Sequence, residues 1–263
     1  LLAACQRGSA QLVKLLVDSK ASCSAECVDA VLRRAAEGSK AALPILDILL
    51  RRNAAPSLAG LQLATETNQG SALKLLAAAG VKLNRKGLLH LATSPASVAL
   101  LTDSKCDLEE RDQQGRTPFL AACARNRLDL ARVLQSRGCQ PTATDKAGNT
   151  ALHLAPSLPV VRYLVNELKL STSALNRLRQ TALISMVQLQ AHRFETAELA
   201  RGLASLMNVN AVDVTGCSAL LYAAHGARVE LVRTLLELNA NLHETSADGR
   251  NAMHFAVNNP RDA

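Results

Sequence analysis

Cysteine and histidine side chains are the groups in this sequence best suited to bind a metal ion or to act as nucleophile and base. Cys23 and Cys27 are four residues apart, which would place two thiolates on one face of a helix. A structural zinc site needs four ligands, however, and no second pair is nearby. His192, His225 and His243 share no spacing with a cysteine or a carboxylate that would complete a site. We therefore expect free thiols and no metal ion.

The sequence also lacks the motifs of common enzymes. The segment Gly38-Ser-Lys40 looks like the end of a phosphate-binding loop, but the upstream glycine and the preceding strand are missing. There is no Gly-x-Ser-x-Gly, His-Glu-x-x-His or protein-kinase signature. We predict a protein that is not an enzyme, with no catalytic residue and no cofactor.

The composition favours a core of small and aliphatic side chains. Hydrophobic residues make up 48% of the 263 residues, whereas aromatic residues make up 2% and Trp is absent. The seven cysteines, an odd number without a secretory signal, favour free thiols in a reducing compartment. No apolar run approaches the roughly 20 residues of a membrane span. We expect an intracellular, cytoplasmic protein, with cytoskeletal or nuclear association left open.

Four copies of one segment recur along the chain. They read Asp112-Gln-Gln-Gly-Arg-Thr-Pro-Phe, Asp145-Lys-Ala-Gly-Asn-Thr-Ala-Leu, Asp213-Val-Thr-Gly-Cys-Ser-Ala-Leu and Ser246-Ala-Asp-Gly-Arg-Asn-Ala-Met. Their glycines are 33, 68 and 33 residues apart, and the middle gap holds a degenerate copy in which Arg179 replaces the glycine. Such a period is typical of a repeat protein.

A second pattern follows each copy at the same phase. Apolar residues recur at i, i+3 and i+4, which is one face of a helix. Examples are Leu130-Ala-Arg-Val-Leu134, Val160-Val-Arg-Tyr-Leu164 and Leu231-Val-Arg-Thr-Leu-Leu236. Two helices per repeat are therefore predicted, an inner one after the turn and an outer one after that.

Together the patterns resemble the ankyrin repeat, which has an Asp-x-x-Gly turn, a Thr-Pro-Leu-His-x-Ala-Ala inner helix and a Val-Val-x-Leu-Leu outer helix. The resemblance covers essentially the whole chain and implies an all-α solenoid of stacked helix-turn-helix units with short β-turn or hairpin connections. We expect a single array over residues 1–263, with about nine repeats, several of them degenerate. They span residues 1–27, 28–56, 57–83, 84–110, 111–143, 144–175, 176–211, 212–244 and 245–263. Both ends fall in mid-repeat, so we expect a longer polypeptide.

Several side chains have predicted structural roles in this unit. Hydroxyls are expected to cap the inner helices at Thr117, Thr150, Thr181 and Ser218. The resemblance implies that the motif histidines bond to neighbouring turns, and here they are His90, His153 and His254. Cysteines replace core alanines at positions 5, 123 and 217. Prolines near Leu89 and Leu152 predict short inner helices, and an insertion near residues 188–196 predicts longer helices in the seventh repeat.

Positive charge is concentrated in the middle of the chain. Of the net charge of +8, residues 111–180 hold +7, from 11 basic and 4 acidic residues. Turn tips carry Arg116, Lys146, Arg177 and Arg179, and the end of an inner helix carries Arg125 and Arg127. This block is either a solvated face or a binding surface for a partner protein with an acidic surface. Nucleic acid is disfavoured, because no aromatic residues interleave with the arginines.

The family resemblance implies that the array binds other proteins through its concave face and turn tips. We expect a scaffold or adaptor without catalytic activity. The alternative is a regulatory or targeting module of a larger enzyme or channel. The oligomeric state is not indicated by the sequence.

Overall fold

The structure, a computed structural model, describes residues 1–189, 200–202 and 207–257. Its regular structure is helical, and within these ranges the chain forms one isolated β-bridge, between Val212 and Ser218, and no strand. Internal contacts divide the chain into two compact units, one of residues 1–112 and 132–139 and one of residues 113–131 and 140–263. Helix α10 (Leu128–Ser136) contains residues of both.

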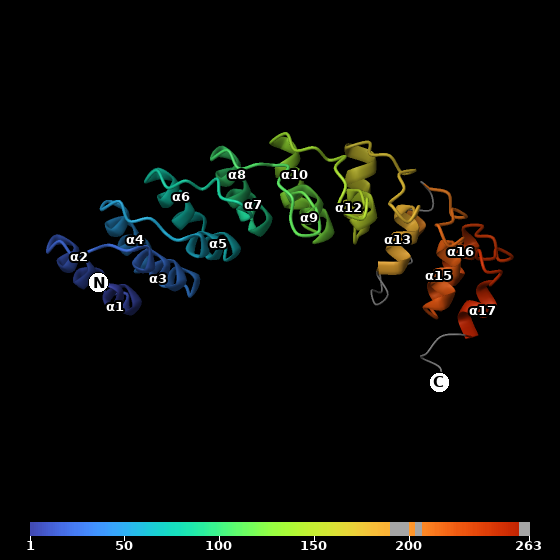
Figure 1. Cartoon of the computed structure of the whole chain (residues 1–263), viewed down its shortest axis with the longest axis horizontal. Helices are drawn as coiled ribbons and strands as arrows, with labels where there is room; N and C mark the ends of the chain where they lie inside the picture. The colour runs from blue at the N-terminus through green and yellow to red at the C-terminus, as the bar shows by residue number, and fades with distance from the viewer. Residues whose placement is uncertain (190–199, 203–206, 258–263) are drawn as a thin grey trace. The chain divides into compact units, whose positions relative to one another are not determined.

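The first unit consists of helix pairs stacked side by side (Figure 1). Each inner helix packs on the next inner helix, and each outer helix packs on the next outer helix, which gives two layers. The inner helices are α1 (Leu2–Arg7), α3 (Ala25–Ala36), α5 (Leu58–Glu66) and α7 (Leu88–Leu91). The outer helices are α2 (Ala10–Asp18), α4 (Ala42–Leu50), α6 (Gly70–Ala78) and α8 (Pro95–Asp103).

The second unit has the same plan. Its inner helices, each of which packs on the next, are α9 (Pro118–Ala124), α11 (Ala151–Leu154), α13 (Ala182–Leu189), α15 (Ala219–His225) and α17 (Ala252–Val257). The outer helix α12 (Leu158–Arg162) runs directly into the π-helix η1 (Tyr163–Glu167). A second outer helix, α16 (Val229–Glu237), packs on α15.

Aliphatic and small side chains form the core of each unit. The largest fully buried residues are mainly leucines, together with Ile45 and Phe119. Full burial of one such side chain contributes about 1.5–3 kcal/mol. The predicted replacement of core alanines is confirmed, because Cys5, Cys123 and Cys217 are all buried and none of them forms a disulfide. Small side chains at these positions let neighbouring inner helices approach closely.

The predicted hydroxyl caps are present at Thr117 and Thr181, and the Thr150 hydroxyl lies 2.8 Å from Nδ1 of His153 at the start of α11. Thr117 accepts a hydrogen bond from the Leu120 amide at 3.3 Å, and Thr181 accepts one from the Ile184 amide at 3.4 Å. The prediction was wrong for Ser218. Its buried hydroxyl finds no hydrogen-bond partner among the described residues, and its backbone pairs with Val212 in the β-bridge.

Helix lengths follow the irregularities of the sequence. The inner helices α7 and α11 are four residues long, as predicted from the nearby prolines. Helix α3 has 12 residues, the longest inner helix of the first unit. Helix α13 ends at Leu189, and the rest of the predicted insertion lies outside the described residues.

Candidate protein-interaction surface

Backbone hydrogen bonds join the turns of successive repeats in the second unit. The Lys146 amide donates to the Gln114 carbonyl at 2.9 Å, and the Arg177 amide donates to the Ala147 carbonyl at 3.0 Å. The same bond recurs from Val214 to Leu178 at 3.0 Å and from Ala247 to Thr215 at 2.9 Å. We call this series the turn ladder. It holds the tips of neighbouring turns in contact and in a fixed register.

The first residue of each turn faces inward and organises the turn. Asp145 accepts hydrogen bonds from the Ala147 amide at 2.9 Å and the Asn149 amide at 2.8 Å. Asn176 likewise accepts hydrogen bonds from the Leu178 and Gln180 amides, both at 3.0 Å. Asp213 accepts them from the Thr215 amide at 2.9 Å and the Cys217 amide at 3.1 Å. The first residue of each of these three turns therefore holds the turn together through its side chain. These side chains bind backbone and contribute little to the outer face.

A left-handed backbone conformation closes each turn. Gly216 has φ of +73°, and a Cβ atom there would lie 2.7 Å from the Ala247 nitrogen in the next turn. Glycine is required at this position for both reasons. Arg179 occupies the corresponding position of the seventh repeat with φ of +56°. The substitution noted in the sequence therefore keeps the turn shape, at a cost of about 1 kcal/mol.

Polar side chains beneath the turns also form hydrogen bonds, two of them between successive repeats. Asn176 donates to the Asn149 side chain at 3.0 Å, and Gln180 donates to Asp213 at 3.3 Å. Tyr222 also donates to Asp213, at 2.6 Å. This cluster was missed in the sequence, because its bonds between repeats join residues 27 and 33 positions apart, which only the fold brings together.

The protonation of this cluster follows from its hydrogen bonds. Burial acts to raise the pKa of the Asp213 carboxyl, but hydrogen bonds from Thr215, Tyr222 and Gln180 outweigh it and hold the pKa below its usual value. Burial and the bond to Asp213 raise the pKa of Tyr222 to about 12. The cluster is thus a carboxylate held by neutral donors at neutral pH.

The predicted role of the motif histidine is confirmed at His153. Its ring is buried, with Nδ1 2.8 Å from the Thr150 hydroxyl and Nε2 2.9 Å from the Gln180 carbonyl of the next repeat. His254 lies with its Nδ1 2.6 Å from the side chain of Asn251, in its own turn. His192 lies outside the described residues.

Four of the predicted basic residues lie along the turn ladder. Lys146, Arg177 and Arg179 are exposed and form no ion pair within the described part of the chain. Arg116 is half-buried and donates to the Gln114 side chain at 3.0 Å. These four residues therefore lie on three consecutive turns, of the fifth to the seventh repeat, that are bonded to one another through the backbone.

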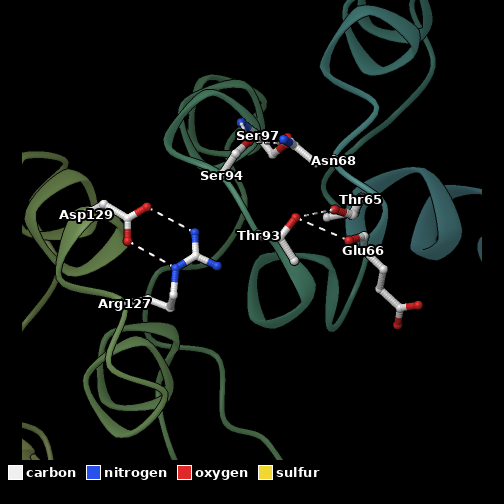
Figure 2. A network of polar contacts seen from close by, with 8 residues as sticks. All are labelled: Thr65, Glu66, Asn68, Thr93, Ser94, Ser97, Arg127 and Asp129. Carbon is white, nitrogen blue, oxygen red and sulfur yellow. Dashed lines mark hydrogen bonds and ion pairs between the residues drawn. The ribbon is translucent and has the colours of Figure 1, made fainter. Parts of the chain in front are cut away.

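The other two predicted residues lie elsewhere. Arg125 caps the C-terminal end of α9, and Arg127 precedes α10, so that α9 separates both from the turn at Arg116. Arg127 donates to the Asp129 carboxylate at 3.2 and 3.0 Å (Figure 2). This hydrogen bond lowers the pKa of Asp129. The charge of Arg127 is therefore balanced by its neighbour.

In the first unit, polar side chains near the ends of the inner helices form hydrogen bonds between successive repeats (Figure 2). Thr93 donates to the carbonyls of Thr65 and Glu66 at 3.5 and 3.2 Å. Ser97 donates to the Asn68 side chain at 3.4 Å. These polar groups tie one repeat to the next, and their bonding capacity is largely used within the chain.

Exposed aliphatic side chains on the turns were missed in the sequence. Leu175 and Leu178 lie before and within the seventh turn, and Val212 and Val214 lie in the eighth. A signal was present in the sequence, because Leu175 and Val212 directly precede the inward-facing Asn176 and Asp213, where other turns carry the polar Arg111, Thr144 and Thr245. The candidate surface therefore combines positive charge with apolar side chains.

The cysteines and the other possible metal ligands bear on the predicted absence of a metal site. No cluster of three or more His, Cys, Asp or Glu side chains placed to hold a metal ion occurs in the described part of the chain. Cys23 precedes α3 and is half-buried, whereas Cys27 is buried within it. Burial raises the pKa of Cys139 to about 12 and that of Cys106 to about 11, which keeps both thiols protonated. None of the described helices is both long and apolar enough to cross a bilayer.

Comparison with solved structures supports the fold class. The crystal structure of the ankyrin repeat domain of Bcl-3, a unique member of the IkappaB protein family, superposes with a TM-score of 0.59. The match has 24% sequence identity and covers 74% of this chain and 92% of that chain. At this identity the likeness concerns the fold alone. The predicted all-α ankyrin solenoid is confirmed.

Two family models identify the repeats directly. One for ankyrin repeats (3 copies) matches residues 89–174, and one for ankyrin repeats (many copies) matches residues 220–259. The chain is an ankyrin-repeat protein, as its motifs predicted. Repeats of this family generally mediate protein–protein interactions and are typically non-catalytic.

Similar proteins include Inversin from Canis lupus familiaris, which is 28% identical over 177 residues, covering 66% of this chain and 15% of Inversin. Transient receptor potential cation channel subfamily A member 1 from Homo sapiens is 23% identical over 151 residues, covering 57% of this chain and 11% of the channel subunit. The chain thus spans a small part of the length of these relatives.

Proposed function

We propose that this chain is a non-catalytic interaction module, a scaffold or adaptor, that binds an acidic surface of a partner protein through its turn tips. The residues that make the contact are Arg116, Lys146, Arg177 and Arg179. The observation that supports this proposal is the turn ladder, which bonds the three turns that carry these residues to one another. Cations on adjacent turns can be matched by one extended acidic segment.

Electrostatics support the proposal. The carboxylates of Asp145 and Asp213, in the sixth and eighth turns, accept hydrogen bonds from backbone amides and, at Asp213, from side-chain donors. Lys146, Arg177 and Arg179 are exposed to solvent. A rigid stack also loses little conformational entropy on binding, because its surface is formed before the partner arrives.

The test is the double charge reversal Arg177→Glu/Arg179→Glu. Both side chains are exposed, and Glu meets the left-handed backbone at position 179 as Arg does, so stability should change by at most about 0.5 kcal/mol. Like charges at an interface cost several kcal/mol. Partners captured from a cell extract by the wild-type chain, and identified by mass spectrometry, should be lost from the variant. The loss should be greatest at low salt, where screening is weakest.

The matched control is Arg162→Glu/Lys169→Glu. It changes the net charge by the same amount, both side chains are exposed, and Lys169 also has a left-handed backbone, with φ of +55°. These residues belong to the outer-helix side of the sixth repeat, away from the turn tips. The control should keep the partners. Capture that is equal for both variants would contradict the proposed site.

A second candidate function is a regulatory or targeting module within a larger enzyme or channel. The match to a segment that makes up 11% of a cation channel subunit favours it. The two candidates share the same binding surface and differ in what is attached to it. Sequencing the complete transcript distinguishes them, because a module would continue into a catalytic or membrane-spanning region.

A further inference from the structure

Two adjacent turns expose an unusual amount of aliphatic side chain. The exposed fractions are 48% for Leu175, 50% for Leu178, 42% for Val212 and 52% for Val214. We call these four residues the turn patch. Isolated exposed leucines are normal on protein surfaces, whereas exposed apolar side chains that cluster often mark a contact site.

The backbone brings the members of the patch together. The Val214 amide donates to the Leu178 carbonyl, so the tips of the two turns touch. Asp213 points inward, where its side chain is buried and bonded, and the residues on either side of it, Val212 and Val214, therefore face outward. Leu175 is placed in the same way beside the buried Asn176.

Positive charge borders the patch on one side. Arg177 and Arg179 flank Leu178 in the sequence, and the Arg177 amide donates to the turn that carries Lys146. On the other side, the next turn offers Ala247, and its Asp248 pairs with Arg250 at 2.8 Å. The surface thus changes from cationic to apolar along the turn ladder.

We propose that the partner is an acidic segment that also carries an apolar side chain, and that the turn patch binds this side chain. The inference rests on the proposed function. It adds the apolar component of the partner segment and the orientation of that segment along the turn ladder. The acidic part lies along Lys146, Arg177 and Arg179, and the apolar part lies on Leu178 and Val214. Desolvation of the patch adds affinity that charge alone does not supply.

A second copy of this chain is a poorer occupant for the patch. In a twofold-symmetric dimer each surface residue meets the same region of its copy. Contact through the patch would then bring Arg177 and Arg179 close to their own equivalents. Such like-charge contacts are unfavourable, whereas an acidic partner neutralises them.

Three labelled synthetic peptides test the inference with the full chain. One has glutamates followed by two leucines, the second has serines in place of the leucines, and the third has glutamines in place of the glutamates. Fluorescence anisotropy at low salt measures their affinities. We expect the glutamate-leucine peptide to bind about tenfold more tightly than the glutamate-serine peptide. The variant Leu178→Ser/Val214→Ser should abolish this difference and leave binding of the glutamate-serine peptide unchanged.

The matched control is Val229→Ser/Leu242→Ser, which replaces the same two residue types at exposed positions outside the patch. It should retain the tenfold preference. Circular dichroism of both variants establishes that they remain folded.

The remaining outcomes distinguish failure of the turn patch from failure of the acidic-partner proposal. Equal binding of the leucine and serine peptides by the wild-type chain would overturn the role of the patch and leave the acidic-partner proposal intact. Binding of the glutamine-leucine peptide as tightly as the glutamate-leucine peptide would overturn the acidic-partner proposal, and absence of binding by all three would overturn both. A dimer that forms with increasing concentration and is lost in Leu178→Ser/Val214→Ser would assign the patch to a second copy.

Discussion

At the scale of single residues, the turns of the second unit use some side chains to hold the turn together and expose others to solvent. Asp145, Asn176 and Asp213 use their side chains to bind amides of their own turns. The residues that follow them, Lys146 and Arg177 among others, face solvent and bond to the neighbouring turn only through the backbone. Side chains at these outer positions can therefore vary without loss of the turn, which is how one scaffold supports different binding surfaces.

Two glycine substitutions test how much the close contact between neighbouring turns contributes to the free energy of unfolding. Gly216 and Gly249 both have positive φ, so an alanine at either position costs about 1 kcal/mol from backbone strain. At Gly216 the added Cβ would also lie 2.7 Å from the Ala247 nitrogen, whereas at Gly249 it meets nothing within 4 Å. We expect Gly216→Ala to reduce the free energy of unfolding by at least about 1 kcal/mol more than Gly249→Ala. Urea denaturation of the two variants compares them, and equal losses would show that the turns separate at little cost.

At the scale of helices and turns, the repeats differ in how their turns are satisfied. In the second unit, successive turns bond backbone to backbone along the ladder. In the first unit, two turn amides bond to acidic side chains. The Ser57 amide donates to Asp29 at 2.9 Å, and the Gly87 amide donates to Glu110 at 2.8 and 3.0 Å. Such contacts depend on single side chains and give a looser connection between repeats.

Hydrogen exchange should reveal this difference. We expect amides in residues 20–110 to exchange faster than those in residues 111–170, because local opening is easier where turns are joined by side chains alone. Helices α7 and α11 give an internal comparison, since both have four residues and only α11 follows a ladder turn. Mass spectrometry of peptic fragments measures both. Uniform protection, or faster exchange in residues 111–170, would contradict this account.

At the scale of the whole molecule, stability should depend on pH through His153. Burial lowers the pKa of this histidine, although its bond to the Gln180 carbonyl and the charge of Asp145 act in the opposite direction. The unfolded chain therefore binds a proton more readily than the folded chain. Stability falls as pH decreases below the usual histidine pKa of 6.5. We expect a lower urea midpoint at pH 5.5 than at pH 7.5.

The variant His153→Gln isolates this contribution, because glutamine is polar but does not titrate. It should have a lower midpoint at pH 7.5 and a smaller change between the two pH values than the wild-type chain. His243→Gln, at an exposed position, serves as the control for loss of a histidine. An unchanged pH dependence in His153→Gln would show that other groups cause the effect.

Most of the local structure was determined by the sequence itself. The spacing of Gly115, Gly148, Gly216 and Gly249 predicted the turns, and apolar residues at i, i+3 and i+4 predicted the outer helices. The short α7 and α11 followed from prolines in the sequence. These features are predictable because the sign of φ and the face of a helix depend on residues that are close in the chain.

The surface itself was decided by the tertiary structure. Arg177 and Arg179 could be placed on a turn from the sequence, but the balance of Arg127 by Asp129 and the unpartnered Ser218 hydroxyl depend on side-chain positions that spacing does not specify. Leu178 and Val214 are 36 residues apart, across a repeat of irregular length, and they meet because the turn ladder sets the register between repeats. Register between neighbouring repeats is a property of packing, so only the folded stack shows which turn residues share one surface.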